Sequence, residues 1–154
     1  MKFKKFSYKK GDKIIDEILV EKIEKRLFAL NILIDRKTQS TLRATLLQNL
    51  YSDGWSEEVR IHPSRGLTIT SMLGKTGLCL QTGNMARFYA DLLKLQSLYL
   101  DQKITGALYI LPCKSLAEKM GSNMVNYERL KLELEKVFRK IITIPMLIFG
   151  LYEM

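Results

Sequence analysis

Apolar residues recur every three to four positions through the first third of the chain, which is the spacing of one helix face. The pattern over residues 12–34 predicts an amphipathic segment of one or two helices, with Asp12 as the N-cap. A further helix is predicted over 38–51, because its leucines fall on one stripe: Leu42, Leu46, Leu47 and Leu50. Residues 52–54 then have the composition of a turn.

The periodicity changes to alternation after this turn. Three short runs, 59–62, 67–70 and 78–81, alternate apolar and polar residues, as half-buried strands do. The breaks at 63–66 and 74–77 contain proline or glycine, which favour tight turns. The three runs therefore predict an antiparallel meander in which neighbouring strands pair.

The second half of the chain returns to helical spacing interrupted by apolar runs. Helices are predicted over 85–100, 114–120 and 126–140, and strands are predicted over 107–111 and 144–150. A chain of 154 residues accommodates one domain with its own core. We therefore expect a single α/β domain over 1–154.

Lysine and arginine outnumber aspartate and glutamate by 25 to 16, which leaves a formal net charge of +9. A surplus of this size favours a polyanionic partner, namely DNA, RNA or an anionic membrane surface. The first 14 residues hold six lysines and one aspartate, and are interpreted as a flexible arm that neutralises phosphates or as a solvated terminus. Without a run apolar enough for a membrane span or secretory signal, we expect a cytoplasmic protein with no membrane partner.

Cys79 and Cys113 have no CxxC spacing, and His62 is the single histidine. A structural zinc site needs about four cysteine or histidine ligands, so the composition argues against one. Both cysteines stand in apolar, strand-like stretches and are expected to be small core residues. Cys79 is a poor candidate nucleophile, because no histidine is placed in the sequence to activate it.

Several motifs between Gly54 and Tyr152 add to the periodicity. They are Gly54-Trp55, Glu58-Val59-Arg60, the run Gly77–Asn84, the helix Phe88–Gln96, the strand Gly106–Pro112, Met120-Gly121-Ser122, Tyr127-Glu128-Arg129 and the closing Ile144–Gly150. This tract, roughly two thirds of the chain, resembles the BglII/BstYI family of type II restriction endonucleases, within the PD-(D/E)XK nuclease group. The resemblance implies a restriction-endonuclease-like core over 54–154, with a central mixed β-sheet flanked by helices. Residues 1–53 would form a basic arm and a helical N-terminal segment.

The resemblance also implies a place for catalysis, formed by an Asp at the end of one strand and a Glu-x-Gln tripeptide on the next. The Gln-x-Gly-Asn sequence of this chain sets Gln81 on the glutamine, Cys79 on the glutamate and Thr70 on the aspartate, nine residues before Cys79. Mg²⁺ prefers anionic oxygen ligands, and neither a hydroxyl nor a thiol supplies one. The chain therefore resembles the family while lacking both carboxylates.

An alternative is that the acids lie elsewhere, in which case Glu57, Glu58 and Asp91 are the nearest candidates. Asp91 shares a polar helix stripe with Arg87 and Lys94, at spacings of four and three residues. This arrangement is interpreted as a surface ion cluster. The competing interpretation is a carboxylate that has moved to the helix and still holds a metal, although one acid rarely suffices for Mg²⁺.

Six polar or basic side chains near the predicted meander and the following helix are candidates for contact with nucleic acid: Asn84, Arg87, Lys94, Lys75, Arg60 and Arg65. Basic residues on a turn and a helix stripe can follow a phosphate backbone without reading sequence, and a solvated surface is the alternative. Trp55 and Tyr89 are interpreted as core residues and not as platforms for base stacking.

The leading hypothesis is a DNA-binding protein of nuclease fold with catalysis lost or weakened, acting in a restriction or other nucleic-acid defence system. It would need no cofactor, and would act as a homodimer or beside a nuclease partner subunit. A second hypothesis is an active endonuclease with a rearranged Mg²⁺ site. A third is a non-enzymatic scaffold that docks an acidic protein.

Overall fold

The computed structural model describes residues 1–35 and 37–154 and is built on a five-stranded mixed sheet. β6 (Gly106–Pro112) lies at its centre, with β7 (Met146–Tyr152) and β5 (Thr76–Leu80) parallel to it on either side. β1 (Lys2–Tyr8) pairs antiparallel with β7 at one edge, and β4 (Ser71–Leu73) pairs antiparallel with β5 at the other. The expected α/β class with a central mixed sheet is confirmed.

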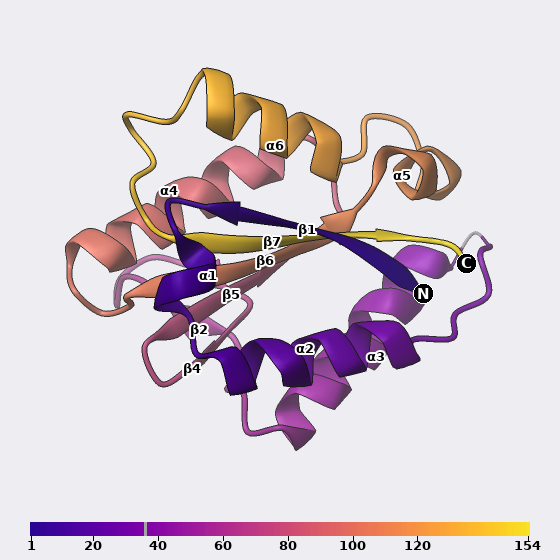
Figure 1. Cartoon of the computed structure of the whole chain (residues 1–154), viewed down its shortest axis with the longest axis horizontal. Coiled ribbons are helices and arrows are strands. Elements are labelled where there is room, and N and C mark those ends of the chain that lie inside the picture. The colour runs from indigo at the N-terminus through magenta and orange to yellow at the C-terminus, as the bar shows by residue number, and fades with distance from the viewer. Residues whose placement is uncertain (36) are drawn as a thin grey trace.

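Helices cover both faces of this sheet, which Figure 1 shows edge-on. α4 (Ala86–Leu100) and α6 (Tyr127–Lys136) lie on one face, and α2 (Glu17–Ala29) and α3 (Thr38–Ser52) lie on the other. β6 and β7 are apolar along almost their whole length because the side chains on both of their faces are buried beneath these helices. No helix among the described residues is long and apolar enough to cross a membrane.

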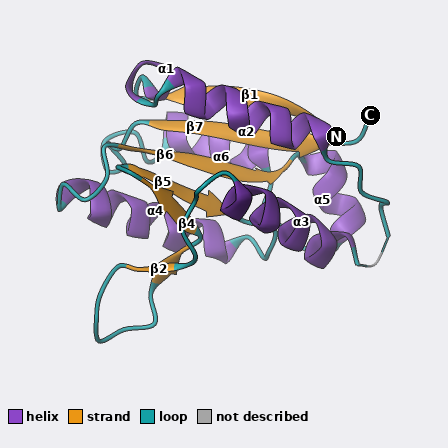
Figure 2. Ribbon diagram, turned by 90° about the horizontal axis from the view of Figure 1, so that it is seen from below, coloured by secondary structure: helices purple, strands orange, loops and turns teal. Residues whose placement is uncertain are grey.

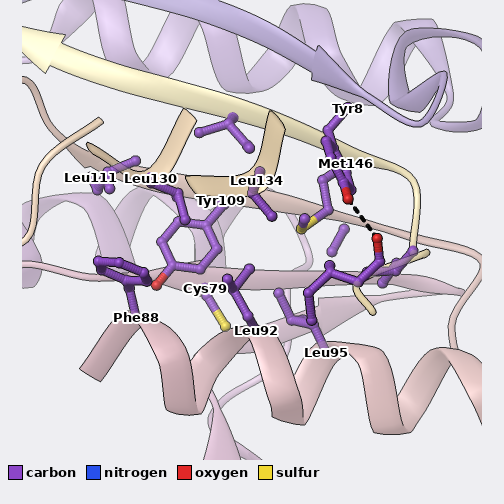
Figure 3. Close-up of a cluster of buried hydrophobic side chains, with 14 of the residues drawn as sticks. Tyr8, Cys79, Phe88, Leu92, Leu95, Tyr109, Leu111, Leu130, Leu134 and Met146 are labelled. Atoms are coloured by element: carbon purple, nitrogen blue, oxygen red, sulfur yellow. Dashed lines mark hydrogen bonds between the residues drawn. The ribbon is translucent and has the colours of Figure 1, made fainter. Parts of the chain in front are cut away.

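The core between the sheet and α4 contains the large side chains Tyr109 of β6 and Phe88 and Leu92 of α4, all buried (Figure 3). Tyr8, the last residue of β1, reaches into the same core. Its hydroxyl donates a 2.6 Å hydrogen bond to the carbonyl oxygen of Ile142, which satisfies both polar groups inside the protein. The edge strand is thereby tied to the segment that leads into β7.

The helical segment expected after residue 12 divides into α1 (Gly11–Ile14) and α2. Asp16, and not Asp12, caps α2 by accepting hydrogen bonds from two amides of its first turn. α1 lies against β7 so closely that a Cβ atom on Gly11 would lie 2.1 Å from the carbonyl oxygen of Met146. The chain therefore needs a glycine here, and it turns away from the sheet before the longer helix begins.

The expectation of a flexible arm at the N-terminus is wrong, because Lys2–Tyr8 forms β1 and pairs with β7 along its full length. Lys4 forms an ion pair with Glu128, and Lys5 forms one with Glu24, so part of the positive charge is matched within the fold. Deleting the first ten residues would remove an edge strand. Such a deletion would not report on phosphate binding alone.

The predicted three-stranded meander is confirmed for its first two strands and wrong for the third. β2 (Val59–Arg60) and β3 (Thr68–Ile69) form a separate two-stranded sheet, and β5 pairs with β4 instead of with β3. The buried hydroxyl of Ser71 donates to the carbonyl of Ser56 where the chain passes from one pairing to the other. Figure 2 shows the loop after β2 extending away from the body of the molecule.

The remaining elements lie near their predicted positions, including α5 (Lys114–Met120). α6 ends at Lys136, four residues before the predicted end at 140. The amides of Val137 and Phe138 both donate to the carbonyl of Glu133, which closes the last turn of the helix. Trp55 is buried beneath α3 in the core of the opposite face, as its interpretation as a core residue required.

Candidate functional site

An open pocket of about 620 Å³ lies at the carboxyl end of β5, between α3 and α4. Ligands of α/β proteins are commonly bound beyond the carboxyl ends of the parallel strands. The pocket is lined by residues from β3, from the segment after β5 and from both helices. The lining includes Arg43, Glu58, Thr70, Gln81, Gly83, Arg87, Asp91 and Lys94.

Thr70 and Gln81, two positions singled out by the family motif, both line this pocket. Thr70 stands between β3 and β4, and its Oγ1 accepts a 3.0 Å hydrogen bond from the amide of Leu80. Gln81 follows immediately at the end of β5. Thr70 and Gln81 therefore lie close together, although a side-chain hydrogen bond, and not a strand pairing, connects Thr70 to the end of β5.

Cys79, the third position of the motif, does not line the pocket. It is 1% exposed and lies beside Tyr109 and Leu92 in the core beneath α4 (Figure 3). Burial, with a smaller contribution from the nearby charge of Asp91, raises the pKa of the Cys79 thiol well above its ordinary range. The thiol therefore stays protonated and neutral, which suits a core residue.

Asp91 is the centre of a hydrogen-bond network on the pocket floor, and the surface ion cluster expected for it is wrong. Its side chain is almost fully buried and accepts from three donors. The side-chain amide nitrogen Nε2 of Gln81 and the hydroxyl of Tyr109 both donate to Oδ2 of Asp91, at 2.6 and 3.0 Å. Lys94 forms an ion pair with Oδ1 at 3.3 Å. Burial, followed by the charge of Asp91, raises the pKa of Tyr109 well above its ordinary range, so the phenol remains a donor.

These residues do not suit a Mg²⁺ ion, which needs several oxygen ligands, usually including one or two carboxylates. Thr70 is neutral, and the side-chain oxygen of Gln81 already accepts a 3.0 Å hydrogen bond from the amide of Gly83. Both oxygens of Asp91 are engaged by internal donors. Glu58 is an exposed carboxylate on the pocket wall. Among residues 1–35 and 37–154, no three Cys, His, Asp or Glu side chains are grouped as metal ligands would be.

The pocket brings together some of the predicted nucleic-acid contacts and separates the others. Arg87 and Lys94 line it. Arg60 and Arg65 are exposed on the projecting hairpin of β2 and β3. Asn84 and Lys75 do not line the pocket.

Asn84 is exposed, forms a single bridge with Met124 and does not line the pocket. Lys75 occupies the turn before β5, at the opposite end of that strand from Gln81, where its ammonium donates to the carbonyl of Gln102 at 3.2 Å. Lys75 therefore lies away from the cations of the pocket, whereas Asn84 lies next to Gly83 in the chain and its carbonyl accepts a 3.1 Å hydrogen bond from the backbone N–H of Arg87.

Arg43 of α3 is a pocket residue that sequence reasoning missed. Its Nη1 donates a 2.8 Å hydrogen bond to the carbonyl of Leu80, at the end of β5. The helical pattern identified its neighbour Leu42 as core, but nothing in the local sequence signals that the next side chain reaches a strand 37 residues away. Glu58, considered only as a spare acid, is also a pocket residue.

Comparison with known proteins agrees with this architecture. A family model described as restriction endonuclease BglII/BglIII matches residues 3–151. The search of curated proteins found no match. Two solved structures of the restriction endonuclease BglII superimpose on the whole chain, each at 16% sequence identity. The complex of BglII with a DNA 16-mer has a TM-score of 0.84, and the match covers 78% of that chain. Free BglII has a TM-score of 0.77, and the match covers 81% of that chain. Because the family model spans nearly the full length, the chain belongs to the BglII/BglIII restriction endonuclease family.

Proposed function

We propose that this chain binds duplex DNA beside the pocket and does not cleave it, or cleaves it only weakly. The observation that carries the proposal is the donor set at the end of β5. By the family resemblance, Thr70 and Cys79 occupy the positions of the motif's carboxylates, and Asp91, a carboxylate of the same pocket, is engaged by Gln81, Tyr109 and Lys94. Glu58 is the other carboxylate that lines the pocket, and a single exposed carboxylate binds Mg²⁺ poorly and does not activate water in the way metal nucleases require.

Binding to DNA is supported by charge and by shape. The chain has a formal charge of +9, and three cations line the pocket, namely Arg43, Arg87 and Lys94. Arg60 and Arg65 are exposed on the hairpin of β2 and β3. The BglII structure that superimposes with a TM-score of 0.84 is a complex with DNA. A projecting hairpin next to a cationic pocket offers contacts to both the groove and the backbone of a duplex.

Two measurements test the proposal. Nicking of supercoiled plasmid at millimolar Mg²⁺ or Mn²⁺ is expected to be absent or very slow with the wild-type protein. Binding of a fluorescent duplex is expected to weaken linearly with salt concentration on logarithmic axes, because phosphate neutralisation releases counterions. Robust metal-dependent cleavage that is abolished by Asp91→Asn would overturn the proposal.

That outcome would support the alternative of an active endonuclease with a relocated acid. The observation in its favour is that two carboxylates, Glu58 and Asp91, line the same pocket. An undetectable interaction with DNA at low salt would instead support a non-enzymatic scaffold that docks an acidic protein.

The wider context of the protein is proposed by analogy with its family. We propose a cytoplasmic homodimer that serves a restriction or other defence system, either alone or beside an active nuclease subunit. Sedimentation with and without a duplex tests the dimer, which predicts two copies of the chain on each DNA molecule.

A further inference from the structure

We propose that the pocket seats a phosphate of the DNA backbone directly on Arg43, Arg87 and Lys94, with no divalent cation between protein and phosphate. The inference rests on the proposed function and specifies its ligand. Direct binding of this kind differs from metal-dependent phosphate binding because it does not require Mg²⁺, and this difference can be measured.

The charge balance of the pocket favours an anion. Its wall holds three cations, Arg43, Arg87 and Lys94, and two carboxylates, Glu58 and Asp91, so the formal sum is +3 − 2 = +1. The negative charge of Asp91 is buried and offset by three donors, and Glu58 is exposed to solvent, where its charge is screened. Because Lys94 is the counter-ion of Asp91, Arg43 and Arg87 supply most of the unbalanced positive charge that a ligand meets inside the pocket.

Carboxylates at the two motif positions would reverse this balance. Thr70→Asp would lower the formal sum of the wall from +1 to 0, and Cys79→Glu would add a further negative charge in the core near Asp91. A phosphate would then approach only with a bridging cation. The neutral side chains present in this chain remove the need for such a cation, because they leave the anion facing positive charge.

The two guanidinium groups have donors to spare. Arg43 uses Nη1 to reach the carbonyl of Leu80, which orients the group and leaves its other N–H bonds available. Among the described residues, neither Arg43 nor Arg87 has an acidic partner at ion-pair distance. Guanidinium groups bind phosphate oxygens through paired hydrogen bonds, which are stronger than those between neutral groups.

Gly83 allows Arg87 to lie over the pocket floor. A Cβ atom at residue 83 would lie 2.9 Å from Cδ and 3.3 Å from Nε of Arg87. It would also lie 2.9 Å from Oε1 of Gln81. The absence of a side chain thus lets Arg87 and Gln81 pack closely on the same stretch of backbone.

The experiment measures duplex binding by fluorescence anisotropy in EDTA and in millimolar Mg²⁺. The variants are Arg43→Gln, Arg87→Gln and Lys94→Gln. The control is Lys140→Gln, which removes the same charge from an exposed residue before β7, at the opposite end of the parallel strands. Wild-type protein is expected to bind equally well or better in EDTA, because Mg²⁺ only competes for phosphates.

Each pocket variant is expected to weaken binding by roughly tenfold or more and to lower the salt slope by about one. The control is expected to change affinity less than any of them. Strict dependence of binding on Mg²⁺ would overturn the inference, and so would pocket variants that bind like Lys140→Gln. If the pocket variants bind like Lys140→Gln, the protein would still bind DNA, but not through this pocket. If the wild-type protein fails to bind DNA at low salt, the proposed function fails first.

Thermal melting with inorganic phosphate is an independent readout on the same proteins, and it also reports whether each variant is folded. Phosphate is expected to raise the melting temperature of the wild-type protein and of Lys140→Gln, since a ligand bound only by the folded state stabilises it. It is expected to raise that of Arg87→Gln less. An equal shift in all proteins would contradict a phosphate site in this pocket.

Discussion

The side-chain amide of Gln81 donates a 2.6 Å hydrogen bond to the carboxylate of Asp91. This contact joins the end of β5 to the second turn of α4 and directs the oxygen of Gln81 to the amide of Gly83. Because Tyr109 and Lys94 also donate to Asp91, the carboxylate is fully engaged within the protein. The pocket floor is therefore a closed hydrogen-bond network whose members hold one another in place.

Asp91→Asn is expected to destabilise the fold, because an asparagine places an NH₂ group against donors and leaves at least one of them without an acceptor. The free energy of unfolding should fall by about 1–3 kcal/mol, as for other unsatisfied buried groups. Urea denaturation measures the change. Asp101→Asn, at the exposed end of the same helix, is the matched control and is expected to lie within about 0.5 kcal/mol of wild type. A neutral effect of Asp91→Asn would show that the network does not support the fold.

Gly83→Ala is expected to weaken DNA binding several-fold and to lower the melting temperature less than Asp91→Asn does. The added methyl group must displace the ends of Arg87 and Gln81, which are flexible side chains. Ser115→Ala, at an exposed position of α5 outside the pocket lining, is the control. Anisotropy titrations compare the two variants. Equal affinities would mean that the position of Arg87 is unimportant for binding.

The double variant Thr70→Asp with Cys79→Glu tests whether the family's metal ligands can be restored. Without metal it is expected to be less stable than wild type, because the carboxyl group that replaces the Cys79 thiol starts from a fully buried position beside Asp91. Mn²⁺ should raise the melting temperature of the variant and should leave that of the wild type almost unchanged. We also expect weak nicking of plasmid by the variant. An equal Mn²⁺ shift in the wild-type protein would contradict the conclusion that its pocket lacks metal ligands.

The two buried thiols predict how stability depends on pH. Burial is the main cause that raises the pKa of Cys113 to about 12, and it raises the pKa of Cys79 as well. An unfolded thiol loses its proton near about pH 8.5, so the folded state binds more protons at higher pH. The stabilising contribution is therefore complete below about pH 8.5 and is lost as the pH rises toward 12.

Urea midpoints measured across this alkaline range are expected to fall with pH, and Cys113→Ala should reduce the slope. At neutral pH neither thiol should react with iodoacetamide until the protein is unfolded, since both side chains are buried. Rapid alkylation of the native protein at one site would contradict the buried placement of that cysteine.

Local spacing was sufficient to predict α3, α4, α5 and β6, because each buries a regular stripe or a continuous apolar run, and such patterns are read within one element. The family resemblance placed Thr70 near Gln81 through a short segment of chain. The fold class followed from the same two sources. All of these features depend on residues that are close in sequence.

The features that the sequence did not predict depend on contacts between distant segments. β1 finds its partner in β7 at the other end of the chain, so its lysines were interpreted as a free arm. Asp91 is buried only because α4 lies against Tyr109 of β6, and Arg43 belongs to the pocket only because α3 lies beside the end of β5. Charge, burial and hydrogen bonding at a site are sums over neighbours in space, and those neighbours are set by how the helices pack on the sheet.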